Sequence, residues 1–202
     1  MKRIGMKRML FFVIKRIPFN SLRVFIYKYF FKYKIGINVK IGRCVINAKR
    51  VTIGNNVMIR DDNHIACKTL KIGKNVSIHS GNRFMGTANF TIGDNSRIIN
   101  NHFIDLYNNV TIGSNSWLAG KNSQIWTHGS ISTKQGKKLD VEIGDHVYIA
   151  SNVNIAPGVK ISDVNLVGLA SVVTQSFNES ETIILGNPSK VVKNNIDWRK
   201  NW

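Results

Sequence analysis

Aliphatic residues recur every six positions along most of the chain. The clearest run lies near the C-terminus and consists of Ile143, Ile149, Ile155, Ile161, Val167 and Val173. A period of six matches neither the 3.6 residues of a helical turn nor the alternation of a half-buried strand. It predicts short strands joined by tight turns, with one apolar side chain of each strand pointing inward and three strands forming a coil of about 18 residues.

Ile-Gly pairs mark the turns of this repeat. They begin at Ile35, Ile41, Ile53, Ile72, Ile92, Ile112 and Ile143. The residues that follow are rich in Gly, Asn and Asp, which tolerate the positive φ of tight turns. A single coil cannot bury its own apolar face, whereas about seven stacked coils bury a continuous column. We therefore predict an all-β fold, a parallel β-helix over residues 35–193, followed by a C-terminal tail over residues 194–202.

The repeat is interrupted once, between Ile112 and Ile143. These two Ile-Gly pairs are 31 residues apart, about 13 more than a regular coil requires. The polar stretch 126–140 accounts for the excess and predicts a projecting loop. Loops held on a rigid scaffold are where binding and catalytic residues concentrate.

His128 lies at the base of this loop and is the candidate general base. Imidazole titrates near neutral pH, so it can take the proton of an attacking alcohol. Taken alone, the same residue also suits a surface histidine that makes hydrogen bonds. His102 lies one coil earlier, can line the same cleft and is a second candidate. The other histidines are expected to be structural or exposed, with the last one at a turn: His64, His79 and His146.

The first 34 residues do not follow the repeat. Basic pairs alternate with apolar clusters, and Pro18 is expected to separate two short amphipathic helices. The longest apolar run, residues 9–14, is far shorter than the roughly 20 residues of a spanning helix, and the segment fits a signal peptide poorly. Cationic side chains around an aromatic face suit an anionic membrane surface. The alternatives are packing on the chain's own domain or on a neighbouring subunit, and nucleic-acid binding, for which no recognised module is present.

Charge is concentrated in the same part of the chain. The formal net charge is +18, no acidic residue precedes Asp61, and residues 1–60 hold 15 of the 29 Lys and Arg. The two cysteines, Cys44 and Cys67, form no disulfide framework and suit a reducing compartment. We therefore expect a cytoplasmic protein, peripheral on the inner face of the plasma membrane if its basic segment binds lipid. No Cys/His cluster has zinc-ligand spacing, and we expect no metal requirement.

The ladder, the loop and the C-terminal end together resemble the hexapeptide-repeat acyltransferases. The nearest subgroup is similar to the galactoside and maltose O-acetyltransferases and to the acetyltransferases of bacterial surface polysaccharides. The repeat resemblance covers residues 35–193, its detailed motifs cover residues 98–193, and residues 1–34 lie outside it. It implies a left-handed β-helix, acetyl-CoA as co-substrate, a sugar hydroxyl as acceptor, and homotrimers with active sites between subunits.

The resemblance also implies roles for individual residues. Thr127-His128 matches the family's catalytic histidine, and Asn101 matches an acceptor-binding asparagine. Trp126 and His102, which lie beside these positions, are assigned to the acceptor as well. The positions assigned to the cofactor are Tyr148, Ala150, Ser151, Gly168, Leu169, Thr174, Lys190 and Lys193.

The implied mechanism is direct transfer, in which His128 deprotonates the hydroxyl while backbone N–H groups and Ser151 stabilise the oxyanion. N-acetylation of an amino sugar would use the same base and fold. A β-helix scaffold without activity is the non-enzymatic alternative. A zinc carbonic anhydrase on this fold would need three converging histidines with a close pair, which the sequence lacks.

Overall fold

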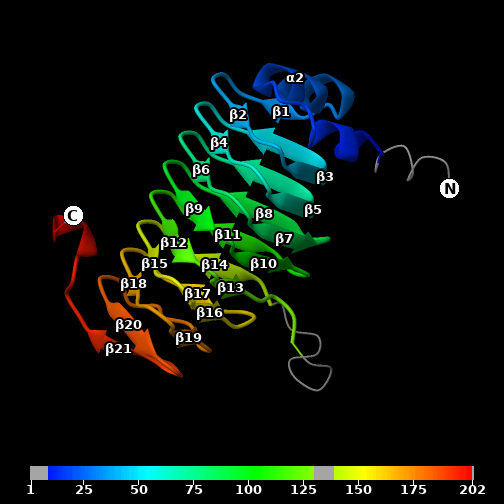
Figure 1. Cartoon of the computed structure of the whole chain (residues 1–202). Coiled ribbons are helices and arrows are strands. Elements are labelled where there is room, and N and C mark those ends of the chain that lie inside the picture. The colour runs from blue at the N-terminus through cyan, green and yellow to red at the C-terminus, as the bar shows by residue number, and fades with distance from the viewer. Residues whose placement is uncertain (1–8, 130–138, 202) are drawn as a thin grey trace.

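The chain folds into a parallel β-solenoid of about seven turns with helices at its N-terminal end (Figure 1). The computed structural model describes residues 9–129 and 139–201. The predicted fold class, an all-β parallel β-helix of hexapeptide repeats with a short helical segment before it, is confirmed.

The strands form two hydrogen-bonded sheets. The first sheet has twelve strands: β1 (Lys34–Ile35), β3 (Val45–Ile53), β5 (His64–Ile72), β7 (Arg83–Gly86), β8 (Asn89–Ile92), β10 (Phe103–Leu106), β11 (Val110–Ile112), β13 (Gln124–Ile125), β14 (Val141–Ile143), β16 (Asn154–Ile155), β17 (Lys160–Ile161) and β19 (Val172–Val173). The second sheet has nine: β2 (Lys40–Ile41), β4 (Met58–Ile59), β6 (Ser77–Ile78), β9 (Arg97–Asn100), β12 (Trp117–Lys121), β15 (Tyr148–Ile149), β18 (Leu166–Val167), β20 (Ile183–Gly186) and β21 (Ser189–Lys193).

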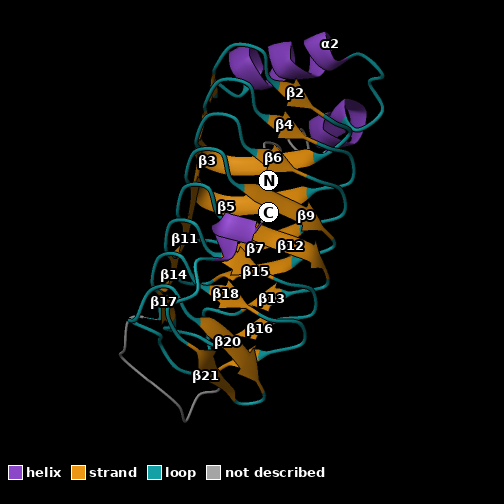
Figure 2. Cartoon of the chain, turned by 90° about the vertical axis from the view of Figure 1, so that its left-hand side faces the viewer, coloured by secondary structure: helices purple, strands orange, loops and turns teal. Residues whose placement is uncertain are grey.

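The solenoid has three sides but only two sheets, because the long strands β3 and β5 run along two of the sides. The first half of β5 pairs with β7, whereas its second half pairs with β8. The first sheet therefore covers two sides, one continuing through β8, β11, β14 and β17 and the other through β7, β10, β13, β16 and β19. The second sheet forms the third side, and Figure 2 shows the stack edge-on.

The apolar ladder lies inside the solenoid, in register from coil to coil. Ile104 of β10 is aligned with Phe84 of β7 and with Ile125 of β13, and all three side chains are fully buried. Most ladder residues are aliphatic, and β-branched side chains pack well on a pleated surface. The predicted six-residue period is therefore the spacing of buried side chains around the three sides.

Asparagines at positive φ form one corner of the solenoid. Asn38, Asn56 and Asn75 have φ of 54°, 57° and 58°. The side-chain amide of Asn38 donates to Oδ1 of Asn56 at 3.0 Å, and that of Asn56 donates to Oδ1 of Asn75 at 3.1 Å. In a later coil, His146 occupies a turn position of the same kind, with φ of 56°. The sequence predicts this turn position for His146.

Helical segments cover the N-terminal end of the stack. Residues 9–14 are helical, and α2 (Asn20–Phe25) continues into a π-helical turn, η1 (Ile26–Phe30). Pro18 lies between the two segments. No helix among the described residues is both long and apolar enough to cross a bilayer.

The C-terminal tail folds back onto the second sheet. The 3-10 helix η2 (Trp198–Asn201) places Trp198 over Tyr148, with ring centroids 5.5 Å apart. The indole N–H of Trp198 donates to the carbonyl oxygen of His146 at 2.8 Å. The tail is therefore part of the packed molecule rather than a free extension.

Candidate active site

The candidate site lies where the chain leaves β13. The N–H of Trp126 still donates to the carbonyl oxygen of Ile155 at 3.0 Å, so Trp126 remains paired with the next coil. Thr127 is fully buried, and His128 is the first residue to project. On the far side of the insertion, Leu139 is already buried. The projecting part is therefore shorter than the predicted loop 126–140, whose residues 130–138 lie outside the described part of the chain.

The carboxylate of Asp105 contacts the imidazole of His128. Its Oδ2 atom lies 2.8 Å from Nδ1 of His128. The same oxygen accepts the hydroxyl proton of Thr127 at 2.6 Å and the backbone N–H of Thr127 at 3.0 Å. Asn108 fixes Thr127 in turn, because its backbone N–H donates to the Thr127 hydroxyl at 2.9 Å and its side-chain amide donates to the Thr127 carbonyl at 2.7 Å.

These contacts keep Asp105 ionised. Burial alone would raise the pKa of its carboxyl group, but the hydrogen bonds from Thr127 and His128 outweigh burial and lower that pKa. An ionised carboxylate only accepts hydrogen bonds, so Nδ1 of His128 must carry the proton in this contact. In the neutral imidazole, the other ring nitrogen, Nε2, is then the one without a proton, and in that form it can act as a base.

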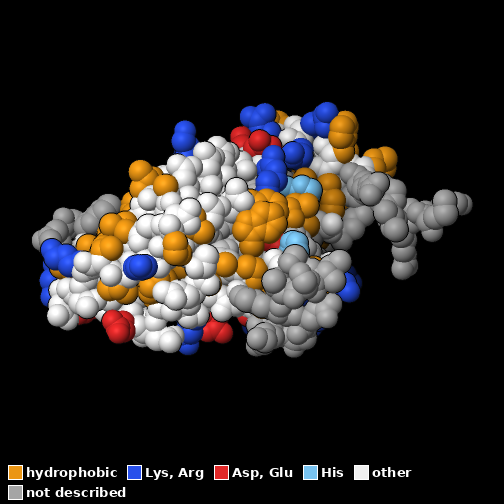
Figure 3. Space-filling model, turned by 90° about the horizontal axis from the view of Figure 1, so that it is seen from below, with side chains coloured by type: hydrophobic (Ala, Val, Ile, Leu, Met, Phe, Trp, Pro, Cys, Tyr) orange, Lys and Arg blue, Asp and Glu red, His pale blue; other side chains and the backbone are white. Residues whose placement is uncertain are grey.

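Aromatic rings border the imidazole. The ring centroid of Tyr107 lies 5.5 Å from that of His128. The ring centroid of Trp126 lies 5.8 Å from it, and these two rings pack edge to face. The indole N–H of Trp126 donates to the side chain of Gln124 at 3.0 Å, which fixes the indole. About half of the His128 side chain is exposed, at 47%. Figure 3 shows histidine side chains beside hydrophobic ones on the face seen from below.

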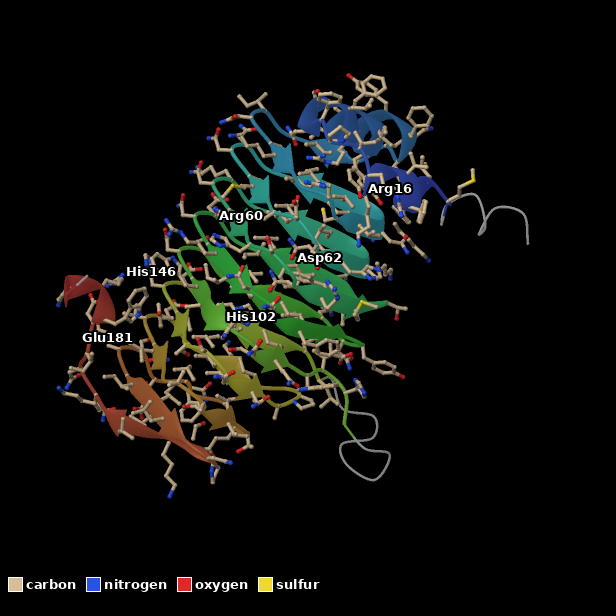
Figure 4. All side chains as sticks on the ribbon, in the orientation of Figure 1. Arg16, Arg60, Asp62, His102, His146 and Glu181 are labelled. Carbon is tan, nitrogen blue, oxygen red and sulfur yellow. The ribbon has the colours of Figure 1, made fainter. Side chains whose placement is uncertain are left out.

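His102 does not join this site. It is 1% exposed and lies inside a corner of the solenoid, within the body of the stack in Figure 4. Its Nδ1 atom accepts the backbone N–H of Ser123 at 3.0 Å. Burial lowers the pKa of His102 to about 4, so its imidazole is neutral. The predicted contact with an acceptor is therefore not available to this side chain, because it has no exposed surface.

His102 has a structural role that is apparent from the fold but not from the sequence. Asn63 and Asn82 occupy the same inner corner in the two preceding coils, and Oδ1 of Asn63 accepts the backbone N–H of Asn82 at 2.9 Å. Oδ1 of Asn82 accepts the backbone N–H of His102 at 2.9 Å in the same way. His102 thus replaces an asparagine in a buried ladder of acceptors that satisfies backbone donors.

Asn101 and Trp126 lie at two different corners. Asn101 is exposed at a turn with φ of 58°, and its Oδ1 atom lies over Gly81, where a Cβ atom would approach it to 2.0 Å. Trp126 is half-buried and contacts His128. The structure therefore brings Trp126, but not Asn101, to the imidazole within one chain.

The residues assigned to the cofactor lie on lower coils. Tyr148 is half-buried on the second sheet between Trp117 and Trp198. Ser151 follows it at the next corner, where its hydroxyl accepts the N–H of Lys121 at 3.2 Å. The remaining positions fall into a half-buried or buried set at backbone turns, Ala150 and Gly168, and an exposed set, Leu169, Thr174, Lys190 and Lys193. None of the contacts described for the site joins these residues to His128 of the same chain.

Sequence reasoning missed Asp105, Thr127 and Tyr107 as partners of the base. Strand register supplies the signal for Asp105, since Ile104 is aligned with Ile125 and the next pair of positions is Asp105 and Trp126. An acidic residue directly after a buried ladder residue is unusual in a chain with only 11 acids. Within residues 9–129 and 139–201, no three His, Cys, Asp or Glu side chains converge as a set of metal ligands.

The chain as a whole is similar to known acetyltransferases. No protein-family model matches the chain. A protein of Escherichia coli K12, WcaF, named as a colanic acid biosynthesis acetyltransferase, is 28% identical over 63% of this chain and 70% of its own length. The crystal structure of the polysialic acid O-acetyltransferase OatWY matches 82% of this chain and 90% of its own, with 29% identity and a TM-score of 0.66.

A third similarity concerns the fold. A hexapeptide-repeat acetyltransferase of Vibrio cholerae, solved in complex with acetyl coenzyme A, matches 94% of this chain and 85% of its own. The TM-score is 0.52 at 19% identity, which shows a shared fold. The repeat, the coil stacking and these relatives together support an acyltransferase that is similar to the hexapeptide-repeat acyltransferases.

Proposed function

We propose that the protein transfers an acetyl group from acetyl-CoA to a sugar hydroxyl, on a bacterial surface glycan or its lipid-linked precursor. The observation that carries the proposal is the 2.8 Å contact between Nδ1 of His128 and the buried, ionised carboxylate of Asp105. In the neutral imidazole this contact directs the lone pair of Nε2 outward, on a side chain that reaches solvent. The resemblance of this chain to two glycan-directed acetyltransferases by name supports a sugar acceptor.

His128 acts as general base in the proposed reaction. Its Nε2 atom takes the proton of the sugar hydroxyl as the hydroxyl oxygen attacks the thioester carbonyl carbon. The carbon–sulfur bond then breaks, and the imidazolium returns its proton to the departing thiolate. Asp105 stabilises the imidazolium that exists between these two steps and keeps the ring oriented. Backbone N–H groups and Ser151 are the proposed donors to the oxyanion.

The chemistry of the lower coils fits coenzyme A. Leu169 is 65% exposed, and an exposed leucine at this position suits the pantetheine arm. Lys190 lines a shallow hollow together with Phe177 and Val191, which combines a cation for phosphate with apolar surface. Lys193 lies on the same strand, β21, and adds a second cation. Acetyl-CoA would supply the activated acyl group there.

A trimer with its active sites between subunits accommodates this arrangement. His128 and the exposed cofactor positions occupy different corners and coils of one chain. A hollow of about 580 Å³ on the first sheet is lined by residues such as Glu142, Asp145 and Lys160 and does not include His128. A neighbouring subunit that presents its own Leu169 and Lys190 to His128 would complete the site. Both cysteines are free thiols, as a cytoplasmic location requires.

The proposal is tested by supplying acetyl-CoA and a panel of oligosaccharides and following release of the CoA thiol. We expect thiol release that depends on the acceptor. The product should contain an acetyl ester, which hydroxylamine cleaves, whereas the amide formed by N-acetylation would resist it. His128→Ala should lower the rate about 100- to 10,000-fold. The matched control is His146→Asn, because asparagine suits the positive φ of this turn, and its rate should stay unchanged. Full activity in His128→Ala would refute the mechanism.

A further inference from the structure

The helical cap turns polar side chains toward the solenoid. Arg23 is buried, and its Nε–H donates to the carbonyl oxygen of Ile41 at 2.7 Å. Asn20 accepts the N–H of Ile41 at 2.8 Å. The hydroxyl of Tyr27 donates to the carbonyl oxygen of Cys44 at 3.0 Å and accepts the N–H of Ile46 at 3.1 Å. These side chains satisfy backbone groups of the first coil, which has no coil before it.

The outer side of the same cap is apolar. Leu22, Phe25 and Tyr29 recur at helical spacing on the side away from Arg23 and are 45%, 48% and 60% exposed. A surface helix normally turns its apolar stripe to the core and its polar stripe to solvent. This segment is apolar on both sides, because Val24, Ile26 and Tyr27 pack on the core while these three side chains face solvent. We call the full set of exposed apolar residues the cap surface: Met9, Phe12, Val13, Phe19, Leu22, Phe25, Tyr29 and Phe30.

Cations border the cap surface. The guanidinium of Arg16 lies 3.4 Å from the ring centroid of Phe12, and the ammonium of Lys28 lies 5.8 Å from that of Tyr29. Lys15 contacts Asp62 at 3.7 Å, an exposed pair that leaves both charges in water. Figure 4 shows Arg16 at the helical end and Asp62 on the coils below it. No acidic residue lies in the cap itself, because none precedes Asp61 in the sequence.

A shallow hollow lies where the cap meets the first coil. It has a volume of about 540 Å³ and is lined by Lys28, Lys32 and Lys34 together with Tyr29 and Tyr33. Three ammonium groups beside two aromatic rings suit a phosphate headgroup whose acyl chains lie against apolar surface. The hollow adjoins the cap surface, because Tyr29 belongs to both.

We propose that the cap surface docks on an anionic lipid membrane and that the solenoid stands on the bilayer by its N-terminal end. Apolar side chains surrounded by Lys and Arg are the pattern of a helix that lies in the lipid–water interface. A second copy of the chain is a poorer occupant, since two caps face to face would oppose the same cations with no acidic partner. Within the cap, α2 lies across the N-terminal end of the stack, away from the later coils (Figure 1).

The test is flotation of the purified full-length protein with vesicles. One set of vesicles contains phosphatidylcholine alone, and the other contains phosphatidylcholine with phosphatidylglycerol. We expect flotation with the anionic vesicles, and about tenfold weaker binding for Leu22→Ser/Phe25→Ser/Tyr29→Ser and for Lys28→Glu/Lys32→Glu. Because all five side chains are exposed, thermal unfolding should confirm that both variants fold.

Two matched controls share the chemistry but lie elsewhere. Val192→Ser removes an exposed apolar side chain from β21, and Lys68→Glu/Lys71→Glu reverses two exposed charges on β5. Both should bind vesicles as the unaltered protein does. Failure of the unaltered protein to float with anionic vesicles would overturn the proposal, as would unchanged binding by the cap variants. A fall in the mass of the assembly in the apolar variant would identify the cap as a subunit contact and also overturn it. Acetyl transfer to a soluble acceptor does not depend on docking and should be unaffected.

Discussion

Two histidines at neighbouring corners of the solenoid show how differently the same ring can be used. At the inner corner, Nδ1 of His102 accepts a hydrogen bond from the backbone of Ser123. At the outer corner, Nδ1 of His128 faces the carboxylate of Asp105 and donates to it. The partner of Nδ1 fixes which nitrogen carries the proton. His102 therefore has its proton on Nε2, buried and without a hydrogen bond among the described residues, whereas the proton of a neutral His128 is on Nδ1.

Burial and the Nδ1 partner, rather than position in the chain, separate a structural histidine from a reactive one. His102 satisfies a backbone donor and stays neutral, because burial lowers its pKa to about 4. His128 has the exposure that a substrate requires and a carboxylate to stabilise its charged form. Substitutions at either histidine, or at its partners, test this difference.

Removing the charge at the outer corner should have the largest effect. In Asp105→Asn, the amide oxygen can still accept from His128 and Thr127, but no negative charge remains to stabilise the imidazolium. We expect kcat to fall about 100-fold with little change in KM for acetyl-CoA. Steady-state kinetics at fixed acceptor concentration measures both. A change confined to KM would contradict the role assigned to Asp105.

Loosening the carboxylate should have a smaller effect. Thr127→Val removes the hydroxyl that donates to Asp105 at 2.6 Å and leaves the N–H of Asn108 without its acceptor. We expect a loss of about 1–3 kcal/mol in the free energy of unfolding and about a tenfold fall in kcat. Thr127→Ser keeps the hydroxyl and should restore most of both. Equal kinetics in the two variants would show that the hydroxyl does not position Asp105.

Changing the inner corner should alter acid stability and spare activity. The unfolded imidazole takes up its proton near pH 6.5, whereas the folded one does so near pH 4. The unfolded chain binds the extra proton between these values, so stability is full above pH 6.5 and falls by about 3 kcal/mol as pH drops to 4. His102→Asn restores the residue type of the two coils before it and should remove this loss, with kcat within about twofold of the unaltered protein. Denaturant unfolding at pH 7 and pH 4.5 compares the two chains, and an identical pH dependence would contradict the assignment.

Periodicity made the fold predictable because each six-residue step has one physical cause, a buried side chain on one side of a three-sided coil. The spacing of Ile104 and Ile125 alone predicts that both are buried and aligned. The turn residues are equally local, since Asn56 and His146 need only tolerate positive φ. The insertion after Ile125 was visible for the same reason, although strand pairing carries Trp126 and Thr127 further into the sheet than polarity suggests.

The site was less predictable because it is made between coils. Asp105 and His128 are 23 residues apart, and only the register of β10 against β13 brings them together. An acceptor contact was predicted for His102 because a sequence does not distinguish an exposed histidine from a buried one. The ladder of hydrogen-bond acceptors formed by Asn63 and Asn82 becomes apparent only when the coils are stacked. The cap is a similar case, since Arg23 reads as a surface cation and lies buried.

The even stacking of coils makes the solenoid a molecular ruler. Neighbouring strands are about 4.8 Å apart, and four steps separate β3, directly under the cap, from β13. If the cap rests on a bilayer, His128 stands about 20 Å above it, whatever the thermal motion of the surrounding lipid. Such a height selects acceptors by length, because a sugar attached directly to a lipid would lie beneath the base and one several residues along a growing chain would reach it. Inserting or removing a single coil between cap and site would shift the modified position by one increment of this scale.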